Sequence, residues 1–548
     1  MNKKNIVIFV LIIIIASFLR LYKIVDIPPG VNRDEASIGY TAYSILNTGR
    51  DEYGRLFPFS LQSFGDWKLP LYIYTVVPFV SFFGLSELAV RLPSAFFGIL
   101  SVILTFYLIK TLFKNNTLAF LAMFLAAISP WSIHLSRVES ESNTAVFLTL
   151  AGVILFLKSL DSKRWLIIPG SIFLALTYFT YAGNHIFTTL LVLGLTFIYR
   201  KQITKTRINL VALFIFLILS GFIFYNTLFG ADKTKLSGIG IFGDPSVVHA
   251  KIELPRLEHV NFGSFFTRLV HNRVVFAMER FGQNYVNAFS GEFLFTKGGT
   301  NNAHNIANFG NMYLIEAPFL FLGLVYLIAI KKGKEKSLIL FWFLISPIAA
   351  SITKDAPHTN RKFAIFPMFS LISVFGIYYL LTEIIRQNLL KKIFLGFIVG
   401  LFIINASIYL DRYYVHFPKN EARSWGVGYK ALNNLLSQPS FVSKKVIMER
   451  PKYSPYIYLL FYSKYSPSLY QKQAMRYSPT EDGFVDVREF DRYEFRKIDW
   501  NKDLSKDTVL VAWSTDVPKS IKNKHKTQEI TLENGESMFT IIDPNSVL

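Results

Sequence analysis

Residues Leu88–Phe113 read LAVRLPSAFFGILSVILTFYLIKTLF. Between Arg91 and Lys110 this stretch holds no charged residue. A helix rises 1.5 Å per residue, so the stretch is long enough to cross a hydrocarbon core of about 30 Å. Comparable apolar runs recur from Ile6 to Leu410 in this chain of 548 residues. The pattern predicts an α-helical polytopic membrane protein.

The composition excludes several other classes. Hydrophobic residues make up 52% of the chain and charged residues 17%, with a mean hydropathy of +0.35. A soluble chain usually carries about 25% charged residues, and the strands of an outer-membrane barrel are short and alternate in polarity. The chain has no cysteine, which excludes disulfides, thiolate metal sites and a cysteine nucleophile. The net charge of +21 does not indicate nucleic acid as a partner, because membrane proteins concentrate Lys and Arg near anionic lipid.

Hydropathy predicts about eleven transmembrane helices. The segment Leu69–Phe83 is apolar but short and contains Pro70 and Pro78, so it is interpreted as an interfacial or re-entrant helix on the outer side. The predicted spans are Ile6–Leu21, Leu88–Phe113, Leu118–His134, Thr144–Leu157, Trp165–Tyr181, Ile186–Tyr199, Ile208–Phe229, Met312–Ile330, Leu338–Ile352, Phe363–Leu381 and Ile393–Leu410.

Charges in the loops predict the orientation. Alternate loops are rich in Lys and Arg, as in residues 331–336, and all of them lie on the side of the N-terminus. This is the bias expected of cytoplasmic loops, and an odd number of spans then puts the C-terminus outside. The N-terminal run is interpreted as an uncleaved signal anchor. The Lys and Ile bias, with no organelle signal, favours the plasma (inner) membrane of a prokaryote.

The predicted organisation is a transmembrane domain over residues 1–410, with large outer loops at 22–87 and 230–310. An extracytoplasmic α/β domain over residues 411–548 follows. In this tail Lys445–Met448 and Thr508–Trp513 are typical of strands, and Pro455–Tyr462 is typical of a buried helix.

The predicted spans are nearly free of charge, and the unusual polar residues lie at their outer ends and in outer loops. Channels and transporters tend to hold charges within spans, so this distribution favours chemistry at the outer surface. Asp34 and Glu35 are adjacent acids, and desolvation of one could give it a pKa suited to base catalysis. The alternative is a solvated loop with a helix N-terminal Asp. Lys68 could bind a lipid phosphate, or it could be a snorkelling Lys.

Further polar residues share the outer side. Arg137 is disfavoured there by the charge bias, so we expect an anionic partner for it; an internal pair with Glu139 or Glu141 is the alternative. The remaining residues could be ordinary helix caps or structural histidines, and they are His304, Asn305, His358 and Arg361. The sequence has no Walker, Rossmann, HExxH or GxSxG motif, so nucleotide hydrolysis and standard hydrolase chemistry have no support.

The order and sidedness of several short motifs resemble the GT-C glycosyltransferases. The resemblance is to their polyprenol-phosphate-dependent branch, which contains the protein O-mannosyltransferases and the lipid A aminoarabinose transferases. It covers most of the membrane part and none of the tail. It rests on residues 33–36 (Arg-Asp-Glu-Ala), 66–72 (Asp-Trp-Lys-Leu-Pro-Leu-Tyr), 90–93 (Val-Arg-Leu-Pro), 129–137, 293–295 with His304, and 357–358 with Arg361.

The resemblance implies site residues and a GT-C fold. Asp34 matches the catalytic acid of the family and Glu35 the second member that supports the site. Lys68 matches the Lys near the donor phosphate, and Glu141 matches an outer carboxylate for which Glu139 is the competing candidate. The chain lacks the His-Pro-Pro stretch and the MIR-type lectin insertion of the protein mannosyltransferases, and both departures count against a protein acceptor.

The resemblance also implies the reaction. A polyprenyl-phosphate donor of a hexose, such as mannose, would enter sideways, and Asp34 would take a proton from an acceptor hydroxyl in an inverting transfer. The substrate-binding residues would be Lys68, Arg137, Glu141, His304, Asn305, His358 and Arg361, with the phosphate held by Lys68, Arg137 and Arg361.

The expected partners are the donor, membrane lipid, and an acceptor lipid, glycan or protein. No ligand spacing requires a metal or another cofactor, although the acids of the first loop allow a divalent ion. One alternative is another lipid-linked transfer, such as that of an oligosaccharide or an aminosugar. The others are a lipid-linked sugar transporter or ligase-like membrane protein, and a non-enzymatic receptor whose function lies in the tail.

Overall fold

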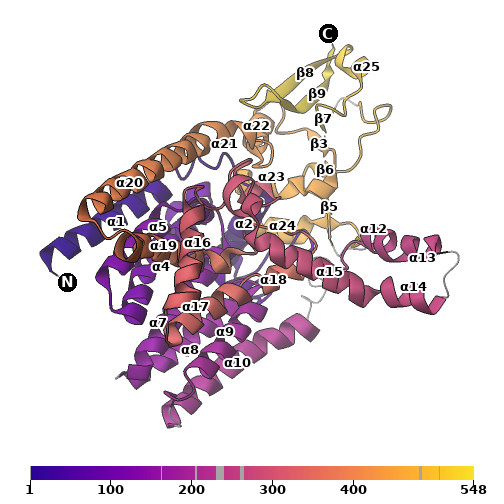
Figure 1. Ribbon diagram of the computed structural model, residues 1–548. Coiled ribbons are helices and arrows are strands. Elements are labelled where there is room, and N and C mark those ends of the chain that lie inside the picture. The colour runs from indigo at the N-terminus through magenta and orange to yellow at the C-terminus, as the bar shows by residue number, and fades with distance from the viewer. Residues whose placement is uncertain are drawn as a thin grey trace. The chain divides into compact units, whose positions relative to one another are not determined.

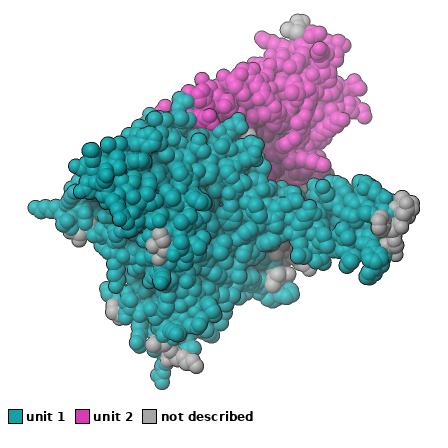
Figure 2. All heavy atoms as spheres, in the orientation of Figure 1, with its two compact units in different colours: residues 1–22, 94–136, 140–411 teal, residues 23–93, 137–139, 412–548 magenta. Residues whose placement is uncertain are grey.

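The computed structural model describes residues 2–161, 163–203, 206–229, 240–259, 264–480, 484–504 and 507–547. Contacts divide the chain into two units, coloured separately in Figure 2. The first unit holds residues 1–22, 94–136 and 140–411, and the second holds residues 23–93, 137–139 and 412–548. The first outer loop and the tail therefore pack in the same unit. This grouping describes packing and does not test a domain boundary near residue 410, which stays a prediction.

The first unit is built of helices (Figure 1). Its α-helices are α1 (Lys3–Leu21), α4 (Glu87–Phe113, whose first seven residues are in the second unit), α5 (Asn116–Ile128), α6 (Pro130–Arg137), α7 (Glu141–Asp161), α8 (Ile167–Leu176), α9 (Asn184–Ile198), α10 (Arg207–Phe229), α12 (Pro245–Val248), α13 (Leu254–Glu258), α14 (Ser264–Val270), α15 (Arg273–Val286), α16 (Glu316–Val325), α17 (Lys334–Ile345), α18 (Ile348–Ser351), α19 (Phe366–Tyr379) and α20 (Asn388–Asp411). Short 3-10 or π turns are η1 (Arg164–Leu166), η2 (Thr177–Phe179), η3 (His249–Glu253), η4 (Asn287–Phe289), η5 (Glu292–Thr296), η6 (Asn302–His304), η7 (Tyr326–Ile330), η8 (Phe363–Ile365) and η9 (Leu380–Ile384).

Long apolar helices make the chain a multi-pass membrane protein. Within the described residues, six helical segments are long and apolar enough to cross a membrane, and a seventh is the bent pair α5 and α6. All seven coincide with predicted spans. The predicted count of about eleven is not confirmed, because the other predicted spans are shorter or interrupted helices. Residues 165–181, for example, fold as η1, α8 and η2.

Helices α16 and α19 cross at two glycines. A Cβ at Gly323 would lie 1.8 Å from the carbonyl oxygen of Ile372, and a Cβ at Gly376 would lie 1.9 Å from that of Phe319. No side chain fits at these distances. In a membrane protein small residues let backbones approach closely, so dispersion contacts take the place of hydrophobic driving force.

The bend between α5 and α6 has an identifiable cause. Pro130 has no N–H for the carbonyl of Ala126, and the N–H of Trp131 donates to Asn311 at 3.2 Å, away from the carbonyl of Ala127. The two helices meet at 54°. A buried arginine of α1 satisfies both freed carbonyls: Arg20 donates to Ala127 at 2.9 Å and to Ala126 at 3.2 Å.

We expect Arg20→Met to destabilise the first unit by about 1 to 3 kcal/mol, because it leaves two buried carbonyls and the hydroxyl of Ser132 without their charged donor. The measurement is the thermal unfolding midpoint in detergent. Arg200→Met is the matched control, since Arg200 is exposed and donates to Phe197 of its own helix end. Equal midpoints for the two variants would contradict this role of Arg20.

The second unit contains helices and a seven-stranded mixed sheet. The sheet order is β4-β5-β6-β3-β7-β9-β8, with β3 parallel to both of its neighbours and the other pairs antiparallel. The strands of this sheet are β3 (Lys445–Met448), β4 (Met475–Arg476), β5 (Val487–Phe490), β6 (Tyr493–Phe495), β7 (Thr508–Trp513), β8 (His525–Thr531) and β9 (Ser537–Val547). Strands β1 (Leu61–Ser63) and β2 (Asp66–Lys68) form a separate antiparallel hairpin. The helices and turns are α2 (Arg33–Thr48), α3 (Pro70–Phe83), η10 (Arg412–His416), α21 (Phe417–Asn420), α22 (Val427–Leu436), η11 (Pro451–Tyr453), α23 (Pro455–Ser463), α24 (Pro467–Gln473) and α25 (Lys519–Lys522).

Local predictions for this unit are confirmed. Strands β3 and β7 have the predicted bounds, and α23 is the predicted buried helix, with every residue from Pro455 to Phe461 buried. The short apolar segment Leu69–Phe83 forms α3. Its placement at a membrane surface stays a prediction.

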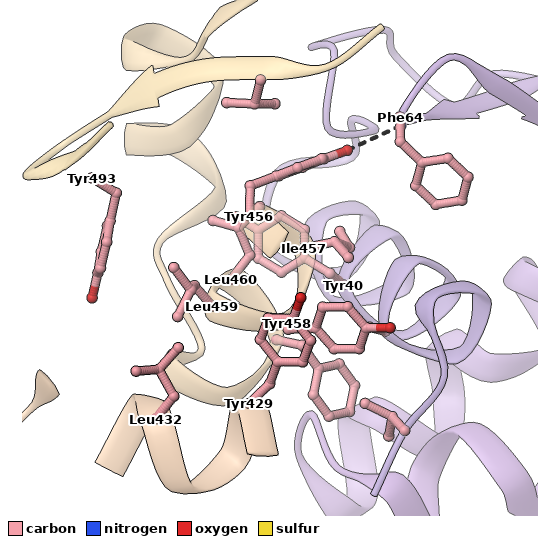
Figure 3. Close-up of a cluster of buried hydrophobic side chains, with 14 of the residues drawn as sticks. Tyr40, Phe64, Tyr429, Leu432, Tyr456, Ile457, Tyr458, Leu459, Leu460 and Tyr493 are labelled. Atoms are coloured by element: carbon pink, nitrogen blue, oxygen red, sulfur yellow. Dashed lines mark hydrogen bonds between the residues drawn. The ribbon is translucent and has the colours of Figure 1, made fainter. Parts of the chain in front are cut away.

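One core joins the first outer loop to the tail. It takes Tyr40 from α2, Tyr429 from α22 and Tyr456 and Tyr458 from α23 (Figure 3). The rings of Tyr429 and Tyr458 stack with centroids 4.0 Å apart. Aromatic side chains bury large areas, so this core fixes α2 against the tail domain.

Candidate active site

Helix α2 carries the Asp-Glu pair at its N-terminus. The side chain of Asn32 caps the helix and accepts from the N–H of Glu35 at 2.8 Å. A helix N-terminus favours carboxylates, which explains two acids in the first turn. The two carboxylates differ in exposure: the side chain of Asp34 is 42% exposed and that of Glu35 is 0% exposed. Asp34 is therefore the accessible carboxylate of the pair.

Glu35 forms a buried, two-point ion pair with Arg91 of α4. The Nε–Oε1 distance is 2.9 Å and the Nη2–Oε2 distance is 2.8 Å. The remaining N–H groups of Arg91 donate to carbonyls of the turn before α2, including those of Ile24, Pro28 and Gly30. All five donors of the guanidinium are thus used. This pair positions the start of α2.

Lys68 lies beside Asp34. It ends β2 of a short hairpin, with Leu61 opposite it in register. Its Nζ lies 2.6 Å from Oδ1 of Asp34 and 3.4 Å from Oδ2 of Asp66, and its side chain is 7% exposed. The structure thus brings together the predicted base and the predicted phosphate ligand as an ion pair.

We expect Glu35→Ala to destabilise the protein by about 3 to 5 kcal/mol, because it leaves the buried Arg91 charge without its counter-ion. Glu292→Ala is the control: Glu292 pairs with Lys297 at 2.8 Å, both side chains are exposed, and such pairs contribute little. The thermal midpoint in detergent measures both. A Glu35→Ala protein as stable as the control would show that the pair does not hold the loop.

Arg137 is the last residue of α6, but it belongs to the second unit, where it is buried. Its Nη2 donates to the carbonyls of Ile27 at 2.9 Å and Lys23 at 3.2 Å, and its guanidinium lies over the rings of Tyr413 and Tyr414. Its exposed fraction is 0%. These contacts stabilise the turn before α2, and the anionic partner and the phosphate contact stay predictions.

The competing carboxylate residue Glu139 also contacts the Asp-Glu pair, although through its backbone. Its N–H donates to Oε1 of Glu35 at 3.1 Å. The buried carboxylate of Glu35 therefore accepts from two segments at once, which adds to its structural role.

In the first unit two predicted histidines meet. The rings of His304 and His358 lie 5.2 Å apart, and the N–H of Arg361 donates to Nδ1 of His358 at 3.3 Å. Burial, followed by the charges of His304, Arg361 and Lys362, lowers the pKa of His358 well below its usual range. His358 is therefore neutral at physiological pH and suited to hydrogen bonding.

Asn305 joins the same two loops. Its Nδ2 donates to the carbonyls of Lys297 and Ile306 at 3.0 Å, and its Oδ1 lies 3.5 Å from Oγ1 of Thr359. The amide thus closes its own loop and contacts the loop of His358. This arrangement is typical of a structural role.

Glu141 begins α7 beside the His358 loop. The hydroxyls on either side of it, Ser140 and Ser142, both donate to Oδ1 of Asn360. Glu141 itself is half-buried. The structure thus brings Glu141, His304, Asn305, His358 and Arg361 into one region of the first unit.

Arg361 lines a narrow hollow in this unit. Its other polar lining residues are Ser142, Thr149, Tyr181, Asn184 and Ser346, and its apolar side chains are those of Val146, Phe187, Trp342, Ala349 and Ala364. One Nη2 contact goes to Asp355 at 3.2 Å, while the buried Nη1 has no hydrogen-bond partner among the described residues. Such a guanidinium is suited to bind an anionic or hydroxylated ligand.

Several residues of these regions were not predicted. Burial lowers the pKa of Lys362 to about 7, and its Nζ donates to the carbonyl of Asn284 at 3.1 Å. The sequence placed Arg91 in the motif of residues 90–93 but predicted no ion-pair partner for it. Its position near the outer end of a span was the signal, because a charge there requires compensation. Among the described residues, no group of three or more His, Asp or Glu side chains is arranged to hold a metal ion.

Comparison with known proteins confirms the resemblance found in the sequence. A sequence model of the dolichyl-phosphate-mannose-protein mannosyltransferase family matches residues 10–232, which is less than half of the chain. No curated protein sequence gives a significant match.

Solved structures identify the fold as GT-C. ArnT from Cupriavidus metallidurans bound to undecaprenyl phosphate aligns with a TM-score of 0.55 at 10% identity, covering 99% of this chain and 98% of that one. The archaeal oligosaccharyltransferase AglB from Archaeoglobus fulgidus, in complex with an inhibitory peptide and a dolichol-phosphate, aligns with a TM-score of 0.53 at 12% identity, covering 98% and 74%. Both of these structures contain a polyprenyl phosphate.

Proposed function

We propose that this chain is a membrane glycosyltransferase that moves a sugar from a polyprenyl-phosphate donor to an acceptor hydroxyl on the extracytoplasmic side. The observation that carries the proposal is the contact between the accessible carboxylate of Asp34 and the ammonium of Lys68 at 2.6 Å. The GT-C fold supports a lipid-linked donor, and the family match over residues 10–232 supports a hexose of the mannose type.

Lys68 is the proposed ligand of the donor phosphate. Its ammonium is nearly buried, so a phosphate that reaches it forms a charge-assisted hydrogen bond in a poorly solvated setting. The phosphate then competes with Asp34 for the same cation. Weakening of that ion pair makes the carboxylate of Asp34 a better proton acceptor, since a neighbouring cation favours the ionised form. Donor binding thus prepares the base.

Asp34 is the proposed general base. The acceptor oxygen attacks the anomeric carbon, its proton passes to the Asp34 carboxylate, and the bond from that carbon to the phosphate oxygen breaks on the opposite face. The anomeric centre inverts, and polyprenyl phosphate leaves with one more negative charge. Lys68 stabilises this developing charge, which is usually the largest catalytic contribution.

We also propose that the polar region around Arg361 in the first unit binds a substrate. Its unpartnered Nη1 atom and the neutral His358 supply donors and acceptors suited to a sugar or an acceptor. The acceptor itself stays open between a lipid, a glycan and a protein. The orientation with a cytoplasmic N-terminus and an extracytoplasmic C-terminus, in a plasma membrane, is part of the proposal and is supported by the loop charges.

We expect Asp34→Asn to lower kcat by about 10²- to 10⁴-fold, because the amide cannot take the proton. The assay is release of polyprenyl phosphate from polyprenyl-phosphate sugars by purified protein. Asp26→Asn, at an exposed acid of the same loop, is the control and should keep wild-type turnover. Unchanged turnover of Asp34→Asn, with the thermal midpoint of the wild type, would refute Asp34 as the base.

A further inference from the structure

The turn of the β1–β2 hairpin lies between the proposed phosphate ligand and the tail. Phe64 and Gly65 form the turn, with φ of 42° and 82°. The register pairs Ser63 with Asp66. The guanidinium of Arg33 lies 4.4 Å from the centre of the Phe64 ring and the Nζ of Lys68 lies 5.2 Å from it. A shift of Phe64 therefore moves the surface against which Lys68 is held.

The tail binds both backbone groups of Phe64. The hydroxyl of Tyr456, on α23, accepts from the N–H of Phe64 at 3.0 Å, as Figure 3 shows. The N–H of Val485 donates to the carbonyl of Phe64 at 3.2 Å. A hairpin of three-residue strands has little stability of its own, so these two bonds contribute much of its order.

A buried carboxylate fixes the Tyr456 hydroxyl. Oε1 of Glu52 accepts from Tyr456 at 2.9 Å, and Oε2 accepts from Ser63 at 3.1 Å. Glu52 is 0% exposed. Burial, together with the charge of Glu52, raises the pKa of Tyr456 well above its usual range. The hydroxyl therefore stays protonated and donates a hydrogen bond to Glu52. Its lone pairs then face the N–H of Phe64.

The tail also holds the backbone of Glu52. Arg476 donates to the carbonyl oxygen of Glu52 at 3.1 Å, and its guanidinium lies 4.1 Å from the centre of the Tyr53 ring. Burial raises the pKa of Glu52 to about 7, and the charge of Arg476 opposes this rise. Glu52 is thus held through both its carboxylate and its backbone carbonyl.

We propose that Tyr456 and Glu52 are positioning residues, through which the tail sets the place of Lys68 by way of Phe64. The inference rests on the proposed function, in which Lys68 binds the donor phosphate. Neither residue touches the substrate. The Tyr456 ring packs in the core, and its hydroxyl has the separate task of ordering the hairpin. Removal of the hydroxyl alone therefore weakens donor binding without removing a phosphate ligand.

The test compares Tyr456→Phe with Tyr470→Phe in the full-length protein. Tyr470 is also buried, its ring stacks on Tyr456 with centroids 6.2 Å apart, and its hydroxyl has no hydrogen-bond partner among the described residues. Tyr456→Phe should raise the KM for a polyprenyl-phosphate sugar about ten-fold, leave the KM for the acceptor unchanged, and speed amide hydrogen exchange over residues 61–68. Tyr470→Phe should change none of these.

Three outcomes separate the proposals. A wild-type donor KM in Tyr456→Phe, with an active wild-type enzyme, would overturn the positioning role and leave the proposed function intact. A wild-type protein that releases no polyprenyl phosphate from any donor sugar would refute the proposed function itself. Where Tyr456→Phe does not accumulate in membranes, Glu52→Gln takes its place, since the neutral amide weakens the acceptor of the Tyr456 hydroxyl. It should raise the donor KM about three-fold, and an unchanged KM would overturn the inference.

Discussion

A buried ion pair between Arg91 and Glu35 fixes the start of α2 in the second unit. Burial of two charges is costly, and only further hydrogen bonds make it tolerable. Here the carbonyls of the turn before α2 supply them. Gly30 in that turn has φ of 63°, and a Cβ there would lie 2.6 Å from the carbonyl oxygen of Trp425. A glycine is therefore required where the turn meets the tail.

Because of this ion pair, the two adjacent acids Asp34 and Glu35 differ in their contacts and in their exposure. Glu35 accepts hydrogen bonds from Arg91 and from the N–H of Glu139, and its side chain is 0% exposed. Asp34 lies in the same helical turn, but its side chain is partly exposed and pairs with the side chain of Lys68. One carboxylate stabilises the loop and its neighbour remains accessible. The tail adds order to this region through its contacts with Phe64.

Local features were predictable from the sequence and distant partners were not. The apolar β-branched runs at β3 and β7 predict strands, and the apolar run after Pro455 predicts a buried helix, because side-chain pattern alone decides such elements. The carbonyl partners of Arg91 come from a turn more than 60 residues earlier, and Tyr456 lies 392 residues from Phe64. No periodicity encodes such pairings. The predicted count of about eleven spans is not confirmed, because hydropathy does not detect breaks such as those around α8.

We propose that Asp34 lies at an extracytoplasmic site that binds a polyprenyl phosphate. The natural chain has no cysteine, so Asp34→Cys provides a single thiol for labelling. A membrane-impermeant maleimide applied to intact cells or oriented vesicles measures its accessibility, and added polyprenyl phosphate tests the site. We expect labelling from the outside that slows when the lipid is present. Labelling only after permeabilisation, or at a rate that the lipid does not change, would contradict the claim.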